Sequence, residues 1–161
     1  MILSFHFVSQ SISIAASPQQ VWEALVHPGA AERWRSARFR TDWRVGEAIE
    51  IEATIGTKRY RDKGHVIDFD PPSLLRYTYW SRVSGLPDIP SSYSTITMSL
   101  EPQGGETILT VEQQVPPSPV RKGNGWEIGE ESGRHHVAFY WRMTLPILKR
   151  VVEAGWPGSE A

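Results

Sequence analysis

The chain has 161 residues, with 17 lysines and arginines against 18 aspartates and glutamates, and it contains no cysteine. The lack of cysteine excludes disulfides, thiolate metal ligands and a cysteine nucleophile. A formal charge of -1 argues against general nucleic-acid binding. No apolar run approaches the ~20 residues that span a bilayer, so we expect no membrane partner. The length predicts one domain over residues 1–161. We expect this domain to be cytoplasmic and to have no nucleic acid as partner.

The first part of the chain predicts a strand followed by two short helices. Apolar residues alternate with polar ones between residues 5 and 14, which is the period of a half-buried strand. Ser17 is placed to cap a helix that starts at Pro18, and Gln20 can complete a capping box. His27-Pro28 ends that helix, and residues 30–34 predict a second one.

A series of antiparallel strands follows, at residues 49–55, 59–69, 75–79, 96–100 and 109–113. In the first of them isoleucine and alanine alternate with glutamate and threonine, so one face belongs to the core. Gly64 predicts a bulge or a bend in the second strand. The long loop at residues 81–90 is a candidate lid, and the glycine-rich residues 123–129 are a candidate gate.

The last third of the chain predicts a long amphipathic helix over residues 134–154. Val137, Trp141, Leu145, Leu148 and Val152 recur at steps of three and four residues, which places them on one face. Pro146 predicts a kink in this helix. A curved antiparallel sheet wrapped around one helix is an α+β arrangement that can enclose a hollow for a small apolar molecule.

Short motifs with a common pattern extend over nearly the whole chain. They are Val21-Trp22, Trp34, residues 42–46, residues 64–66 with 71–78, residues 105–110, and Trp141 with Leu145, Leu148-Lys149 and Glu153. These motifs resemble the AHSA-type domain of the START-like (SRPBCC) superfamily. The resemblance implies the helix-grip fold. It also implies a possible chaperone partner, since the domain takes its name from an activator of the heat-shock chaperone ATPase.

The predicted site is the cavity between sheet and C-terminal helix, with apolar walls and a few polar tips. Its candidate ligand-binding residues are Ile51, Ala53, His65, Tyr77, Tyr79, Met98, Val137 and Trp141. The leading hypothesis is non-enzymatic binding of a small, largely apolar lipid-like, polyketide or aromatic molecule. A cyclase, dehydratase or hydrolase that uses the same cavity is the alternative. In that case His65 would orient a ligand or carry a proton, although a hydrogen-bonded structural role is the commoner one for such a histidine.

Other polar clusters predict neither catalysis nor a metal site. Glu50 and Glu52 have the opposite parity to the isoleucines of their strand, so they point to solvent. Adjacent histidines such as His135 and His136 diverge by ~100° on a helix and cannot readily share one metal. We therefore predict no catalytic residue, no metal and no cofactor.

Five arginines lie between residues 33 and 44 against a single aspartate. Arg33, Arg38 and Arg40 from this run are candidate partner-binding residues, because a basic stripe can meet an acidic chaperone surface. The alternative is an ordinary solvated surface. The predicted oligomeric state is a monomer or a homodimer.

Overall fold

The computed structural model describes residues 5–35, 37–55, 57–129 and 131–155. In this part of the chain seven antiparallel strands form one sheet in the order β1-β7-β6-β5-β4-β3-β2. Its strands are β1 His6–Ile14, β2 Ala37–Arg40, β3 Ala48–Ile55, β4 Lys58–Asp70, β5 Leu74–Tyr79, β6 Ser94–Gln103 and β7 Glu106–Val115. The predicted run of antiparallel strands is therefore confirmed.

Three α-helices accompany the sheet within the described residues: α1 Pro18–Val26, α2 Pro28–Trp34 and α3 Ser132–Glu153. The predicted cap is present, because the Ser17 side chain accepts from the backbone N–H of Gln20 and the Gln20 side chain accepts from the N–H of Ser17. The indole N–H of Trp34 donates to the carbonyl of Ala24 over 2.8 Å and ties α2 to α1. No helix in the described ranges is long and apolar enough to cross a membrane.

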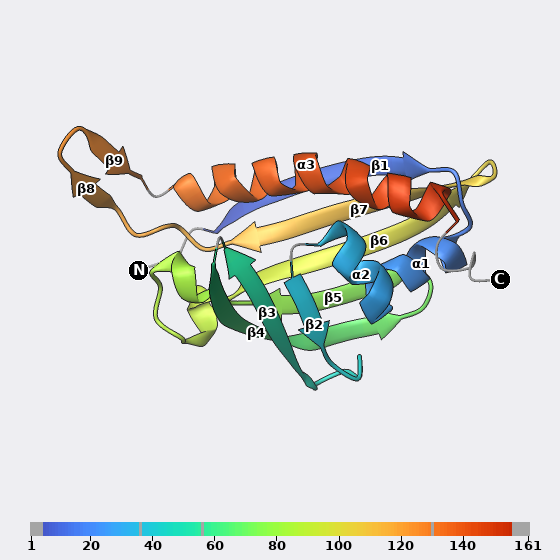
Figure 1. Ribbon diagram of the computed structural model, residues 1–161, viewed down its shortest axis with the longest axis horizontal. Coiled ribbons are helices and arrows are strands. Elements are labelled where there is room, and N and C mark those ends of the chain that lie inside the picture. The colour runs from blue at the N-terminus through green and yellow to red at the C-terminus, as the bar shows by residue number, and fades with distance from the viewer. Residues whose placement is uncertain (1–4, 36, 56, 130, 156–161) are drawn as a thin grey trace.

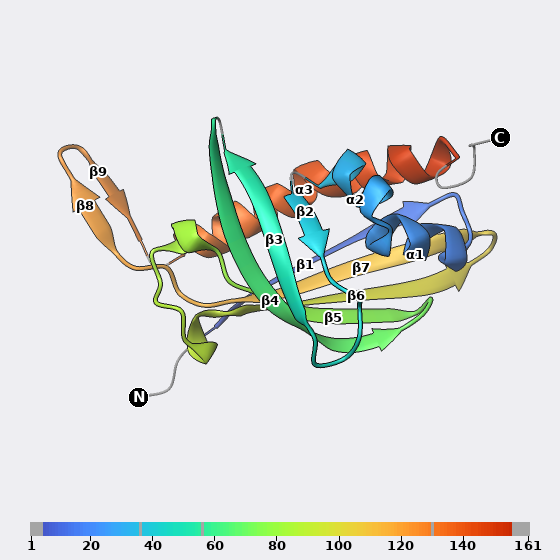
Figure 2. The same ribbon diagram turned by 60° about the horizontal axis from the view of Figure 1, so that its bottom comes forward.

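The sheet curves around the long helix. In Figure 1 α3 lies along β1 and β7, and α1 and α2 lie near its C-terminal half. Figure 2 shows β3 and β4 turned away from β6 and β7, so that the sheet forms a trough that holds α3. The predicted helix-grip fold, an α+β arrangement, is confirmed.

The core is packed unevenly along α3. Leu145, Leu148 and Val152, in the C-terminal half of the helix, are almost completely buried and pack against the sheet and α1. Nearer the N-terminus of the helix, Val137 and Tyr140 are only partly buried. The sheet and helix therefore close on each other at one end and leave space at the other.

Some elements differ from the sequence-based expectations. Strand β2 was not predicted: it is four residues long and pairs only with β3, so it lies at the edge of the sheet. Residues 81–90, expected as a lid, contain the 3-10 turn η1 Arg82–Ser84, and the turn η2 Pro90–Ser92 ends the segment. Residues 123–129, expected as a flexible gate, contribute to a hairpin of β8 Arg121–Gly123 with β9 Trp126–Ile128. This hairpin projects from the body of the molecule (Figure 1).

Pro146 and Gly64 have roles that sequence patterns describe only in part. Helix α3 continues through Pro146, which lies on its exposed side. The irregularity in β4 falls between Val66 and Asp68, close to Gly64 but not at it. Gly64 is required for another reason, because a Cβ at this position would lie 1.7 Å from the backbone oxygen of Thr78 on β5. The glycine therefore permits close approach of two strands.

Candidate ligand-binding site

A cavity of about 210 Å³ lies between the concave face of the sheet and the N-terminal half of α3. We call it the inner cavity. Phe39, Ile51, Ala53, Ile96 and Val137 provide most of its apolar wall. Polar or charged groups come from Arg35, Thr54, Tyr77, Tyr79, Gln113, His136, Tyr140 and Trp141, and Ala37 completes the lining. Such a mixture is typical of small-molecule sites.

The periods of strand and helix bring these side chains together. Ile51 and Ala53 are two residues apart on β3, and Tyr77 and Tyr79 are two apart on β5, so each pair projects to the same face of the sheet. Val137 and its i+4 neighbour Trp141 project from α3 toward that face. The cavity wall is therefore a direct product of alternation and helical periodicity.

Six of the eight predicted ligand-binding residues line the inner cavity: Ile51, Ala53, Tyr77, Tyr79, Val137 and Trp141. Met98 is not among the lining residues and packs in the hydrophobic core instead. His65 lies on the outer face of β4, exposed to solvent, with its ring centroid 6.3 Å from that of Tyr93. Since its neighbours Gly64 and Val66 point inward, alternation turns His65 outward. Contact between these residues and a ligand stays a prediction.

Several lining residues were not predicted. Arg35 belongs to the arginine run that suggested a surface stripe, yet it is buried. Phe39 lies on the unpredicted strand β2, and Gln113 on β7 shares the inward parity of Val111. Tyr140 sits next to Trp141 on α3 and packs against it edge to face at 5.0 Å. The alternation along β7 indicates that Gln113 faces inward, but no local pattern identifies Arg35 as an inward residue.

Hydrogen bonds fix the polar groups of the wall. The indole Nε1 of Trp141 donates to Oε1 of Gln113 over 2.8 Å. The hydroxyl of Tyr79 donates to Oδ2 of Asp62 over 2.8 Å, and the backbone N–H of Arg82 donates to Oδ1 of the same carboxylate over 3.0 Å. Asp62 is only 3% exposed, and these two donors satisfy both oxygens of its buried carboxylate.

Burial keeps the phenols of the cavity neutral. It raises the pKa of Tyr77, Tyr79 and Tyr140 above the ordinary value of 10.0, and the charge of Asp62 adds to the rise for Tyr79. The three hydroxyls are therefore uncharged hydrogen-bonding groups at physiological pH. They can orient a polar substituent on a ligand without adding charge to the site.

A wider hollow of about 460 Å³, the vestibule, adjoins the inner cavity. The two share Ala53, Tyr79, Gln113, His136 and Val137 as lining residues. Residues of the 81–90 and 115–119 segments form much of the remaining rim, together with Tyr60, Asp62, Ser92, Ser94, Ser132 and Gly133. A molecule that enters through the vestibule would therefore meet the apolar wall next.

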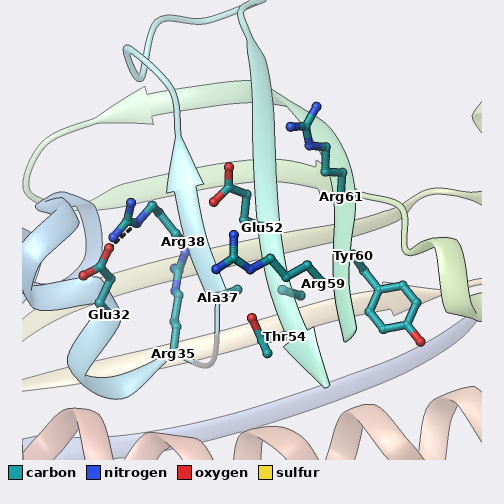
Figure 3. A pocket seen from close by; sticks show the side chains of 10 residues that line it. Glu32, Arg35, Ala37, Arg38, Glu52, Thr54, Arg59, Tyr60 and Arg61 are labelled. Atoms are coloured by element: carbon teal, nitrogen blue, oxygen red, sulfur yellow. Dashed lines mark hydrogen bonds and ion pairs between the residues drawn. The ribbon is translucent and has the colours of Figure 1, made fainter. Parts of the chain in front are cut away.

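On the outer side of β2 and β3 lies a polar surface groove of about 510 Å³, the outer groove (Figure 3). Arg38, one of the predicted partner-binding residues, pairs there with Glu32. Arg40 pairs with Glu52 at 3.3 Å, and Arg33 is exposed on α2. Two of the three predicted partner-binding arginines are therefore neutralised by glutamates of the same surface.

No cluster of three or more histidines, aspartates or glutamates suited to a metal ion occurs in the described part of the chain. Glu50 and Glu52 face away from the inner cavity, and Glu50 lies 3.9 Å from Arg61. His135 and His136 are both exposed, and of the two only His136 reaches the cavity wall.

A trough-shaped sheet closed on one long helix, with a hollow between them, defines the START-like (SRPBCC) class of domains. Within that class the chain belongs to the family described as Activator of Hsp90 ATPase homolog 1-like protein, whose model matches residues 15–153. The predicted AHSA-type resemblance is thereby confirmed.

Solved structures agree with this fold. The solution structure of ChR145 from Cytophaga hutchinsonii is 26% identical, with a TM-score of 0.73 over 96% of this chain and 97% of that one. CV1439 from Chromobacterium violaceum is 21% identical, with a TM-score of 0.70 over 91% and 96% of the two chains. DynU16, a putative protein in the dynemicin biosynthetic locus, is 19% identical, with a TM-score of 0.67 over 92% of this chain and 48% of that one. No curated protein matches the sequence.

Proposed function

We propose that this protein binds a small, largely apolar molecule in the inner cavity, between the sheet and α3. The observation that carries the proposal is the hollow itself: well-packed interiors leave few voids larger than a water molecule, yet about 210 Å³ is open here beside an apolar wall. Transfer of apolar surface from water into such a space is favourable. Neutral phenols around the wall supply hydrogen bonds for orientation.

Further support comes from the connection to solvent. The vestibule shares five lining residues with the inner cavity, so the two hollows lie side by side and we expect a ligand to enter through the vestibule. The combined space reaches the size range of small-molecule sites, roughly 300–1,000 Å³. Binding without chemistry is proposed because the buried carboxylate of Asp62 is already held by Tyr79 and Arg82.

Two matched substitutions on α3 test the proposal. Val137 faces the inner cavity, whereas Phe139, two residues later, is 53% exposed on the outer side of the helix. The neutral fluorescent probe N-phenyl-1-naphthylamine should gain fluorescence on binding to the wild-type protein. Val137→Trp fills the cavity and should abolish that gain, and Phe139→Trp should preserve it. Equal binding by both variants would place the probe elsewhere and refute the proposal.

The family match supports a second proposal, contact with an Hsp90-type chaperone. The surface that would carry it includes Arg33 on α2 and Arg38 and Arg40 on β2. Charge reversal of Arg38 and Arg40 should then weaken capture of the purified chaperone, and added salt should do the same. Capture that is insensitive to both changes would dismiss this surface as the contact.

A further inference from the structure

Arg35 places a charged group inside the molecule, beside the inner cavity. Helix α2 ends at Trp34, and Arg35 caps it with its backbone N–H donating to the carbonyl of Ala31 over 2.8 Å. The residue is only 5% exposed. Its guanidinium carbon lies 4.4 Å from the ring centroid of Trp34 and 4.1 Å from that of Phe39. The side chain lines both the inner cavity and the outer groove, so it stands at the boundary between them. Figure 3 shows Arg35 among the residues of the outer groove.

The two terminal nitrogens of the guanidinium lack a hydrogen-bond acceptor within the described residues. Both terminal nitrogens, Nη1 and Nη2, are buried and have no hydrogen-bond partner. The nearby carboxylates of Glu32 and Glu52 line the outer groove but pair with Arg38 and Arg40 instead. An arginine keeps its charge in proteins, so this fork of N–H donors remains buried, charged and unsatisfied. A buried charge without hydrogen-bond acceptors lowers the stability of the fold unless an acceptor binds to it.

The aromatic rings around Arg35 compensate only part of this cost. A ring face attracts the cation as a whole, but the N–H donors of the planar fork call for oxygen acceptors in their own plane. No acidic residue is among those that line the inner cavity in the described part of the chain. The guanidinium carbon of Arg35 also lies 5.8 Å from the ring centroid of Tyr77, which lines the inner cavity. The missing acceptor is therefore suited to come from a ligand.

We propose that the ligand of the inner cavity is an amphipathic carboxylate, with its apolar body against Ile51, Ile96 and Val137 and its carboxylate accepting from Nη1 and Nη2 of Arg35. This inference rests on the proposed function and adds to it the charge and the orientation of the ligand. A planar carboxylate matches the guanidinium fork in a bidentate manner. An aliphatic and an aromatic acid share this chemistry, and the probes below distinguish them.

Calorimetry with two acid–amide pairs tests the inference at pH 7.5: decanoate against decanamide, and trans-cinnamate against trans-cinnamamide. The acid of at least one pair should bind wild-type protein about 10- to 100-fold more tightly than its amide, the range of one charged hydrogen bond or slightly more. The pair that shows the preference identifies the aliphatic or the aromatic class. Arg35→Met keeps a long side chain without the charge and should remove the preference.

A control and a stability measurement guard against a folding artefact. Arg142, an exposed arginine on α3, does not line the cavity, so Arg142→Met should keep the preference for the acid. Without ligand, Arg35→Met should unfold at the same temperature as wild type or a higher one, because an unpaired buried charge has been removed. Should it fail to fold, Arg35→Lys and the wild-type acid–amide comparison decide the question.

Three results would overturn the inference. Equal dissociation constants for acid and amide in both pairs would refute the role of charge, while binding itself would leave the proposed function intact. A preference for the acid that survives in Arg35→Met would assign the anion to another group. If none of the four compounds binds a protein that still binds N-phenyl-1-naphthylamine, the inference that the ligand is a carboxylate is refuted, and the proposed function stands.

Discussion

Trp141 on α3 donates its indole N–H to the side-chain oxygen of Gln113 on β7 across the base of the inner cavity, over 2.8 Å. Both residues are almost fully buried, at 3% and 5% exposure. The bond joins the helix to the sheet at the position where packing between them loosens. It therefore holds the cavity wall in register while the space beside it stays open.

The first prediction concerns this bond. Gln113→Leu leaves the indole N–H without an acceptor in a buried place and should lower the free energy of unfolding by about 2 kcal/mol. The double variant Gln113→Leu with Trp141→Phe removes both polar partners and should lose less than the sum of the two single changes. Urea unfolding measures the stability of Gln113→Leu, Trp141→Phe and the double variant. Strict additivity would mean that the bond contributes nothing to stability.

The second prediction concerns the close approach of β4 and β5. Gly64→Ala would bring a methyl group within 1.7 Å of the backbone oxygen of Thr78, so the strands must separate. The expected loss in the free energy of unfolding is about 3 kcal/mol. Gly129→Ala, at a site with no heavy atom within 4 Å of the added Cβ, is the matched control and should change stability little. Similar stability of both variants would contradict the argument.

The third prediction follows from the Tyr79–Asp62 bond and its dependence on pH. Tyr79→Phe removes a donor from a buried carboxylate and should cost about 2 kcal/mol near neutral pH. The pKa of Tyr79 is raised above the ordinary 10.0 by burial first and by the charge of Asp62 second. A raised pKa contributes stability that is complete below pH 10 and declines as the pH rises toward the native value.

The difference in stability between wild type and Tyr79→Phe should therefore shrink above pH 10. Unfolding by urea at pH 8, 10 and 11 measures it. Tyr93→Phe is a useful comparison, because burial and the bond to Asp88 raise the pKa of Tyr93 to about 12 at a position outside the inner cavity. A constant difference across this range would contradict the linkage.

The fourth prediction concerns the C-terminal end of α3. Glu153 accepts from the backbone N–H of Ala15 over 2.7 Å and from Nζ of Lys149 over 2.7 Å, and Lys149 also donates to the carbonyl of Ser13. The hydrogen bond from Lys149 lowers the pKa of Glu153 below the ordinary 4.5, and the hydrogen bond from the backbone of Ala15 adds a smaller effect in the same direction. Because the group is largely exposed, Glu153→Gln should cost only about 0.5 kcal/mol at pH 7.

A lowered pKa contributes stability that is present above pH 4.5 and is lost as the pH falls through the native value. The effect of Glu153→Gln should therefore vanish in acid. Urea unfolding between pH 3 and pH 7 measures this, with the exposed residue Glu101 changed to glutamine as the control. An effect that persists undiminished at pH 3 would rule out the charge as its cause.

The sequence by itself determined six of the seven strands of the main sheet, the three helices and most of the cavity wall. Alternation along β3 and β5 and the i, i+4 spacing of Val137 and Trp141 are local periodicities, and each states which side chains share a face. Capping chemistry at Ser17 is equally local. These signals predicted a curved sheet around one helix and six of the residues that line the cavity, and the resemblance of the motifs to the AHSA-type domain implied the helix-grip fold.

Only the tertiary structure decided which inward faces meet a hollow and which meet the core. Met98 and Tyr77 both point inward, but the C-terminal half of α3 fills the space at one end of the trough and not at the other. Strand β2 exists because β3 offers it an edge, and Arg35 is turned inward by the end of α2 just before that strand. Such placements depend on contacts between distant segments, which no local periodicity encodes.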